Sequence, residues 1–343
     1  MQAMTKFARM KRVISLDIPD RVPVLPNTRS FSPKYAGLKY NECLKNPAKY
    51  NEAEVKLFTE LDYDAVWGIA SNGVLEELLG AKIKVFEDAA PVVEPMIKEP
   101  KDLLNLKVPA NISESPNVEL LCRATSQLKE MVGPDVMVIG SGPAAIFRTA
   151  CLLRGITNFY MDIVLNEQFV MDLQEFCFQP SLDFAKAVFS AGADAIFMGN
   201  SVANSGCISR KHYEKFVHPF NKRFFAALKE LNLGPVVYHT CGNWDDRWDL
   251  VADEGPEIVL IGDGDLAEIK EKWGDRFCIM GNVHSVNTML RGSLEDVEKE
   301  AVDCTEKAWS KGGFILSNDC TLSRDTPVEN VKALVEVAKR YRY

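Results

Sequence analysis

The sequence has no apolar run of the roughly 18 residues that a membrane-spanning helix requires. Its N-terminal stretch, MQAMTKFARMKRVISLDIPDRVP, also lacks the apolar centre of a secretory signal. No block rich in lysine and arginine occurs, and the net charge is -8, which argues against a nucleic-acid-binding surface. We therefore expect a cytoplasmic protein that binds neither membranes nor nucleic acid.

A disulfide framework is also missing. The nine cysteines are scattered and odd in number, and histidine is scarce, with only four in the chain. In a cytosolic protein these cysteines are expected to be thiols, most of them small core residues. A cysteine with a special role would then be a metal ligand or a nucleophile.

Short apolar runs ending in turn residues recur along the chain, with helical periodicity between them. We predict eight strands, at residues 22–25, 65–68, 136–140, 195–199, 236–240, 258–262, 277–281 and 314–318. Strands alternating with helices in this way predict a (β/α)8 TIM barrel, with residues 1–343 as a single domain. A doubly wound open sheet is the alternative, weakened because no G-x-G-x-x-G follows the first strand.

The connection between the second and third predicted strands is unusually long. We interpret residues of about 69–135 as an insertion of helical and loop segments, with a small hairpin as one option. Helices are predicted from periodic apolar positions at residues 209–231, 266–273, 293–311 and 327–341.

A His-x-Cys motif ends the predicted fifth strand, in VVYHTCGN. His239 and Cys241 are two residues apart, so both side chains are expected on the same face of the strand. Cys320 follows the predicted eighth strand and would lie on the same rim, because the C-terminal ends of barrel strands share one face. One imidazole and two thiolates suit Zn²⁺ with a fourth position open. Spacing alone leaves open the alternative of a core thiol and a hydrogen-bonded histidine.

The chain resembles the uroporphyrinogen decarboxylase superfamily in six stretches: RVISLDIPDRVPVLP, GSGPAAIFRTACLLRG, GADAIFMGNSVANSGCISRKHYEKFVHPF, VVYHTCGNW, DLAEIKEKWGDRFCIMGNV and GGFILSNDCTLSRDTPVENVKAL. Members of this superfamily are (β/α)8 barrels, in agreement with the strand count. The true decarboxylases carry an Arg-Gln-Ala-Gly-Arg-type segment that holds the substrate carboxylates. Here the corresponding stretch, PNTRSFSPKYAGL, keeps only Arg29.

The chain is more similar to the branch of zinc-dependent, cobamide-linked methyltransferases, whose signature is His-x-Cys followed far downstream by Cys. This resemblance implies that His239, Cys241 and Cys320 bind one Zn²⁺ per chain. It also implies methyl transfer between a small substrate and the cobalt of a corrinoid. The chain lacks the Asp-x-His-x-x-Gly-type segment of many corrinoid carriers, so we expect the corrinoid on a partner protein docking over the barrel mouth. Barrels of this family occur as monomers and as homodimers.

The motif leaves the direction of transfer open. We favour O-demethylation of a methoxylated aromatic, because the predicted rim offers mainly apolar and neutral hydrogen-bonding side chains. Transfer from methylcobamide to a thiol, of the coenzyme M type, is the alternative; a uroporphyrinogen-type decarboxylase and a non-catalytic scaffold are less favoured. The predicted substrate-binding residues are Asn27, Arg29, Trp67, Asn72, Phe147, Tyr160, Met198, Asn200, Tyr238 and Asn282.

A fourth metal ligand or an acid/base group is expected near the same rim. The candidates are Glu76, Asp263 and His284. A helix N-cap or a turn is an equally good prediction for a carboxylate at such a position.

Overall fold

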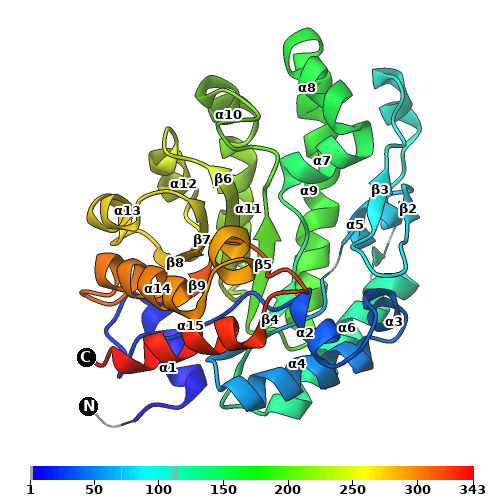
Figure 1. The fold of residues 1–343 in the computed structure, drawn as a ribbon. Helices are drawn as coiled ribbons and strands as arrows, with labels where there is room; N and C mark the ends of the chain where they lie inside the picture. Colours follow the sequence, from blue (N-terminus) through cyan, green and yellow to red (C-terminus); the bar gives the residue numbers. More distant parts are fainter. Residues whose placement is uncertain (1–2, 71, 110, 113–114) are drawn as a thin grey trace.

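The computed structural model describes residues 3–70, 72–109, 111–112 and 115–343. Its main sheet is parallel, has the order β1-β4-β5-β6-β7-β8-β9, and curls with helices on its outer side (Figure 1). Its strands are β1 (Ala65–Trp67), β4 (Met137–Ser141), β5 (Ala195–Gly199), β6 (Val236–Asn243), β7 (Ile258–Asp263), β8 (Cys278–Val283) and β9 (Phe314–Asn318). The predicted barrel architecture is confirmed, and each of these strands overlaps a predicted one.

The first predicted strand is not a regular strand, but it occupies the position that closes the barrel. Val24 forms a parallel bridge with Leu316 of β9. On its other side, the backbone N–H of Asp64, just before β1, donates to the Val24 carbonyl (2.9 Å). Pro23 and Pro26 have no N–H to donate, so a continuous ladder cannot form here. The closure therefore depends on isolated bridges.

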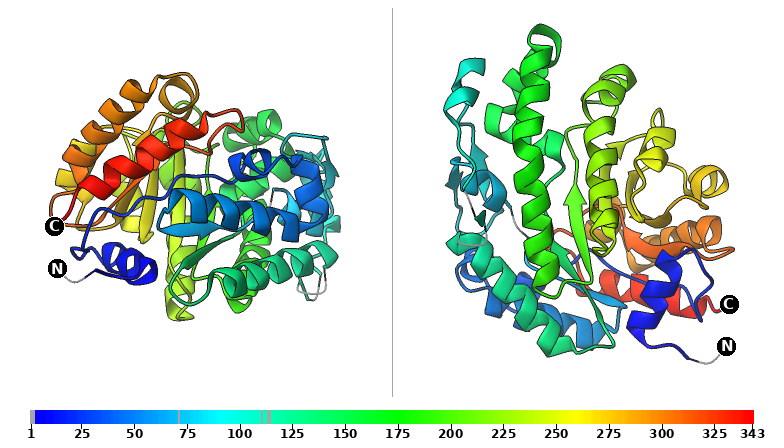
Figure 2. Two further views of the ribbon diagram at one scale, coloured as in Figure 1. Left: turned by 60° about the horizontal axis from the view of Figure 1, so that its bottom comes forward. Right: turned by 180° about the vertical axis from the view of Figure 1, so that it is seen from behind.

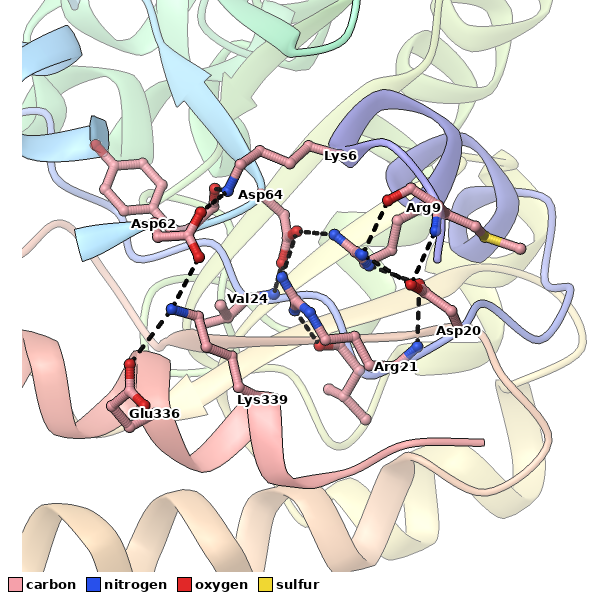
Figure 3. A network of polar contacts seen from close by, with 12 residues as sticks. Lys6, Arg9, Asp20, Arg21, Val24, Asp62, Asp64, Glu336 and Lys339 are labelled. Atoms are coloured by element: carbon pink, nitrogen blue, oxygen red, sulfur yellow. Dashed lines mark hydrogen bonds and ion pairs between the residues drawn. The ribbon is translucent and has the colours of Figure 1, made fainter. Parts of the chain in front are cut away.

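A buried ion-pair network reinforces this closure at the N-terminal end of the strands (Figure 3). The Asp64 carboxylate accepts hydrogen bonds from Arg9 Nη1 (2.7 Å), from Arg21 Nη1 (2.9 Å) and from the Val24 N–H (2.8 Å). Arg9 also pairs with Asp20 (Nε to Oδ1, 2.7 Å). Because the Asp64 side chain is fully buried, its charge is tolerable only with these partners.

The helices cover the outer side of the sheet and complete the alternation of the barrel (Figure 1). They are α1 (Lys6–Ile14), α2 (Phe31–Tyr35), α3 (Tyr40–Lys45), α4 (Pro47–Leu61), α7 (Ile146–Arg154), α8 (Ile156–Leu165), α9 (Glu167–Ser190), α10 (Arg210–Phe216), α11 (His218–Glu230), α12 (Trp248–Glu254), α13 (Leu266–Trp273), α14 (Leu294–Ala308) and α15 (Val328–Arg340). The helix predicted at 209–231 is split into α10 and α11, because Pro219 cannot donate a helical hydrogen bond. No helix in the described ranges combines the length and apolarity needed to cross a membrane.

The predicted insertion lies between β1 and β4. It contains α5 (Val74–Leu78), an antiparallel pair of β2 (Lys82–Lys84) and β3 (Val92–Glu94), the 3₁₀ helix η1 (Pro100–Asn105) and α6 (Pro116–Val132). The small hairpin was the correct option; residues 71, 110 and 113–114 of this range lie outside the described residues. Figure 2 shows the hairpin on one flank of the barrel, opposite α13 and α14.

A second polar network is buried between the sheet and the helices. Glu254 on α12 accepts hydrogen bonds from the Tyr213 hydroxyl (2.6 Å) and from the Asn221 amide (3.0 Å). Asn221 also donates to the Tyr238 hydroxyl (3.0 Å), which links Glu254 to β6. Burial raises the pKa of Glu254 to about 8.

We expect this carboxyl group to make stability depend on pH. Its pKa in the folded protein exceeds the unfolded value of about 4.3, so the protonated form favours folding. Its contribution is complete below that unfolded value and is lost as the pH rises through about 8. Glu254→Gln should therefore show a smaller fall in unfolding free energy between pH 5 and 8 in urea titrations. Glu271→Gln, an exposed control, should keep the wild-type slope; equal slopes in all three proteins would contradict the assignment.

Candidate metal centre

The three predicted metal ligands converge at the C-terminal rim of the barrel. His239 and Cys241 lie on β6, and Cys320 follows the end of β9 by two residues. Their ligand atoms all lie within 4.8 Å of one another. His239 is 7% exposed, whereas both cysteines are half-buried. The curl of the sheet thus brings together donors that are far apart in the sequence.

The end of β6 is shaped to present Cys241. Gly242 has φ = +85°, a conformation that glycine adopts without strain, and the strand register shifts next to it. The Cys241 carbonyl accepts hydrogen bonds from the Asn204 amide (3.1 Å) and from the Trp244 indole N–H (3.1 Å). The turn and these two bonds fix the backbone from which the thiol projects.

The loop after β9 holds Cys320 and orients His239. The Ser285 hydroxyl donates to the Cys320 carbonyl (3.0 Å), and the Cys320 N–H donates back to Ser285 Oγ (3.1 Å). His239 Nε2 lies 3.0 Å from the Asp319 carbonyl. Because a carbonyl can only accept, this contact keeps the proton on Nε2 and leaves the lone pair on Nδ1.

The thiols of Cys241 and Cys320 have pKa values shifted in opposite directions. A hydrogen bond from the Cys241 thiol lowers the pKa of Cys320, and His239 lowers it further. The same hydrogen bond, with burial, raises the pKa of Cys241. An imidazole beside one readily formed thiolate and a second thiol is the mixed nitrogen and sulfur donor set that Zn²⁺ accepts. The donor chemistry therefore fits zinc.

A cavity of about 260 Å³ opens over the three side chains. Three predicted substrate-binding residues, Arg29, Asn72 and Asn200, lie on its wall. A neighbouring cavity of about 270 Å³ shares Arg29 and Asn72 and is also lined by Glu76, whose carboxylate accepts a hydrogen bond from Thr149 Oγ1 (2.9 Å). These four predicted residues are thus brought to the cavities beside the candidate metal centre.

Two predicted substrate-binding residues lie one layer beneath Arg29, outside the lining of these cavities. Asn27 is fully buried, and its Oδ1 accepts a hydrogen bond from Arg29 Nε (3.1 Å). Trp67 donates its indole N–H to the Pro26 carbonyl (2.7 Å), with its ring centre 5.3 Å from the Arg29 guanidinium. Both residues contact Arg29 and neither lines these two cavities, so their contact with a substrate stays an untested prediction.

Met198 and Tyr238 face away from the cavity. Side chains alternate along a strand, and because Phe197 lines the cavity, Met198 points toward the helices. The Tyr238 ring packs against Phe225, with ring centres 5.6 Å apart. Its hydroxyl accepts a hydrogen bond from the Asn200 amide (3.0 Å) on the outer side of the sheet. Neither residue lines the two cavities, and contact with a substrate was predicted for both.

Three other predicted substrate-binding residues make contacts elsewhere and line neither cavity. Phe147 is fully buried against Phe159 (ring centres 5.1 Å apart). Tyr160 donates its hydroxyl to the Val202 carbonyl (2.9 Å). The Asn282 amide donates to the Gly264 carbonyl (3.1 Å). Their positions in the sequence place these residues in connections that follow strands but do not give the direction of their side chains.

Two of the candidates for a fourth ligand are also away from the three donors. Asp263 is exposed at the end of β7. His284 caps the short helix η3 (Ser285–Leu290), because its Nδ1 accepts the N–H groups of Val286 (3.2 Å) and Asn287 (3.1 Å). Of the three, only Glu76 lines either of the two cavities described above, and it lines the one beyond the candidate metal centre.

Sequence reasoning missed two residues that shape the cavity. Phe197 lines it and stacks on Arg29, with the guanidinium carbon 3.6 Å from the ring centre. Arg148, in the first turn of α7, lines both cavities. Alternation along β5 puts Phe197 and Met198 on opposite faces of the sheet, but it does not say which face lines the cavity. Arg148 follows β4 by several residues, and residues in that position of a barrel are expected near the rim.

Comparison with known proteins gives a consistent result. The uroporphyrinogen decarboxylase (URO-D) family matches residues 5–341. The methylcobamide:CoM methyltransferase MtbA of Methanosarcina mazei is 27% identical over 349 residues, which cover 99% of both chains. The methylcobamide:CoM methyltransferase MtaA of Methanosarcina barkeri is 26% identical and covers 94% of both chains. A solved methyltransferase structure from Methanosarcina mazei superposes with a TM-score of 0.90 at 25% identity, covering 98% of this chain and 99% of that one.

Proposed function

This chain belongs to the uroporphyrinogen decarboxylase (URO-D) family, and we propose that within this family it is a zinc-dependent methyltransferase. The proposed reaction moves a methyl group from methylcobamide to a thiol. The observation that carries the proposal is the convergence of His239, Cys241 and Cys320, with ligand atoms within 4.8 Å. Similarity to two methylcobamide:CoM methyltransferases over nearly the whole chain supports the same chemistry.

The residues of this chain would hold the metal and prepare the reacting sulfur. His239, Cys241 and Cys320 would bind Zn²⁺, with the Asp319 carbonyl fixing the histidine tautomer and Ser285 fixing the Cys320 loop. Zinc at this position would supply Lewis acidity that favours a thiolate over a thiol. In the balanced reaction, a C–S bond forms, the Co–C bond breaks with its electron pair left on cobalt as Co(I), and the thiol proton goes to solvent.

The thiol direction replaces our earlier preference for O-demethylation of a methoxylated aromatic. That preference assumed a lightly charged wall, but Arg29 and Arg148 both line the cavity that holds the three donors. The similar proteins are also named for transfer to CoM, a thiol. The corrinoid is expected on a separate partner, since the chain has no Asp-x-His-x-x-Gly-type carrier segment.

The direction of transfer is tested with the zinc-loaded protein and a corrinoid protein. With methylated corrinoid and a thiol, we expect the methyl-Co(III) absorbance to fall and a methyl thioether to appear by mass spectrometry. With Co(I) corrinoid and a methoxylated aromatic, we expect no methyl-Co(III). The opposite pattern would overturn the proposed direction.

A further inference from the structure

Glu54, on α4, is fully buried, and within the described ranges no arginine, lysine or histidine forms an ion pair with it. Two other buried carboxylates, Asp64 and Asp162, each pair with an arginine at 2.7 Å. Burial raises the pKa of Glu54, and its hydrogen bonds oppose that shift. A buried carboxyl group without a counter-charge is costly unless donors surround it, so the donors of Glu54 show what it holds in place.

Two of these donors lie on either side of Arg29 in the sequence. The Thr28 hydroxyl lies within hydrogen-bonding distance of both carboxyl oxygens of Glu54 (3.0 and 2.9 Å), and the Ser32 hydroxyl donates to Oε2. Thr28 and Ser32 are fully buried, so water cannot replace the carboxyl group as their partner. Glu54 therefore fixes both ends of residues 28–32, the segment that carries Arg29.

The other two donors are Trp67, on β1, and Tyr63, just before it. The Tyr63 hydroxyl (2.9 Å) and the Trp67 backbone N–H (3.2 Å) both donate to Glu54 Oε1. The centre of the Trp67 ring lies 5.3 Å from the Arg29 guanidinium and 5.9 Å from the centre of the Phe197 ring. The same carboxyl group thus supports Arg29 twice, through its own segment and through the Trp67 ring.

Arg29 and Phe197 form part of the wall of the cavity over the three candidate metal ligands. The guanidinium carbon of Arg29 lies 3.6 Å from the centre of the Phe197 ring, and this ring centre lies 5.7 Å from that of His239. Glu54 lines neither this cavity nor the neighbouring one. It can therefore affect the cavity only through the side chains that it holds.

We propose that Glu54 is a positioning residue for this cavity: it holds residues 28–32 and Trp67, and these place Arg29 and Phe197 on the cavity wall. The inference rests on the proposed function, in which the cavity receives the methyl-accepting thiol. An apolar side chain could fill the space of Glu54, but it would leave four buried donors without an acceptor. Binding of the thiol should therefore depend on Glu54, whereas binding of zinc should not.

Replacing Glu54 with leucine removes every acceptor atom of its side chain. With coenzyme M as the thiol, we expect the KM to rise about ten- to a hundredfold while kcat changes by less than about threefold. Zinc should still bind at one equivalent per chain. Thr28→Val removes a single donor and should raise the KM by a smaller factor, so it provides the same test if Glu54→Leu does not fold.

Glu54→Gln should keep a KM close to that of the wild type. Its amide oxygen can accept from the Tyr63 hydroxyl and from the Trp67 N–H, as Oε1 does. Its NH2 group can donate to the hydroxyl oxygens of Thr28 and Ser32, which are able to accept as well as donate. A merely destabilising loss at this position would not be rescued in this way with the KM alone.

Asp64→Ala is the matched control. It removes another fully buried carboxylate next to β1, but at the N-terminal end of the strands, and Asp64 lines neither cavity. This variant should lose stability and keep the wild-type KM, measured at a temperature at which circular dichroism shows every variant to be folded. A wild-type KM in Glu54→Leu, or an equal rise of the KM in Asp64→Ala, would overturn the inference.

Hydrogen exchange followed by mass spectrometry tests the inference without methyl transfer. The backbone amides of residues 28–32 should exchange faster in Glu54→Leu than in the wild type or in Glu54→Gln, because the segment opens more readily. Unchanged exchange would contradict the inference, and so would faster exchange with an unchanged KM, which would leave Glu54 a role in the fold alone. If the wild type methylates no thiol, the proposed function fails, and the exchange result then decides the inference on its own.

Discussion

Replacing Cys241 with alanine is expected to remove zinc from the purified protein and to slow methyl transfer by about a thousandfold or more. The ligand atoms of His239, Cys241 and Cys320 lie within 4.8 Å of one another, so loss of one thiolate leaves two protein donors, too few for a stable zinc site. Zinc content is measured by elemental analysis, and transfer by the loss of methyl-Co(III) absorbance.

Cys320→Ala should have the same effect as Cys241→Ala, because both cysteines belong to one donor set. Cys122→Ala provides the matched control, since Cys122 lies on α6, outside the lining of the cavity over the three donors. It should keep both zinc and activity. Full zinc occupancy in Cys241→Ala would show that the metal is held elsewhere.

Replacing Asp64 with alanine should lower the free energy of unfolding by about 3–5 kcal/mol. The substitution leaves Arg9 and Arg21 buried without their shared carboxylate and removes the acceptor of the Val24 N–H. It therefore acts where the barrel closes through isolated bridges. Urea denaturation of the wild type and the variant gives the difference.

Asp62 provides a control from the same part of the chain, also visible in Figure 3. Its carboxylate pairs with Lys6 and Lys339, but its side chain is 60% exposed. Exposed ion pairs contribute little, so Asp62→Ala should cost no more than about 1 kcal/mol. Similar losses for the two variants would mean that the buried network does not hold the closure.

The barrel was predictable because its strands are buried on both faces and therefore read as continuous apolar runs. The closing segment was predicted as a strand, but Pro23 and Pro26 reduce it to single bridges. The rim position of Cys320 also followed from the strand assignment alone. Sequence patterns identify strand ends well, and they give much less about how strands pair.

The direction of side chains at the site could not be predicted from the sequence. Met198 was chosen where its neighbour Phe197 faces the cavity, and His284 was chosen where its ring caps a helix. The charge of the cavity was also missed, because it arises only when the fold brings Arg29 and Arg148 to the wall of one cavity. Such a pairing depends on the three-dimensional fold and has no local sequence signal.

The central claim is that one metal ion, held by His239, Cys241 and Cys320, enables methyl transfer to a thiol. The most direct test titrates Zn²⁺ into the metal-depleted protein while methyl transfer from a methylated corrinoid protein to a thiol is followed. We predict that activity rises from near zero and saturates at one equivalent of zinc per chain. Activity that is already full without metal, or that stays absent at every zinc concentration, would contradict the claim.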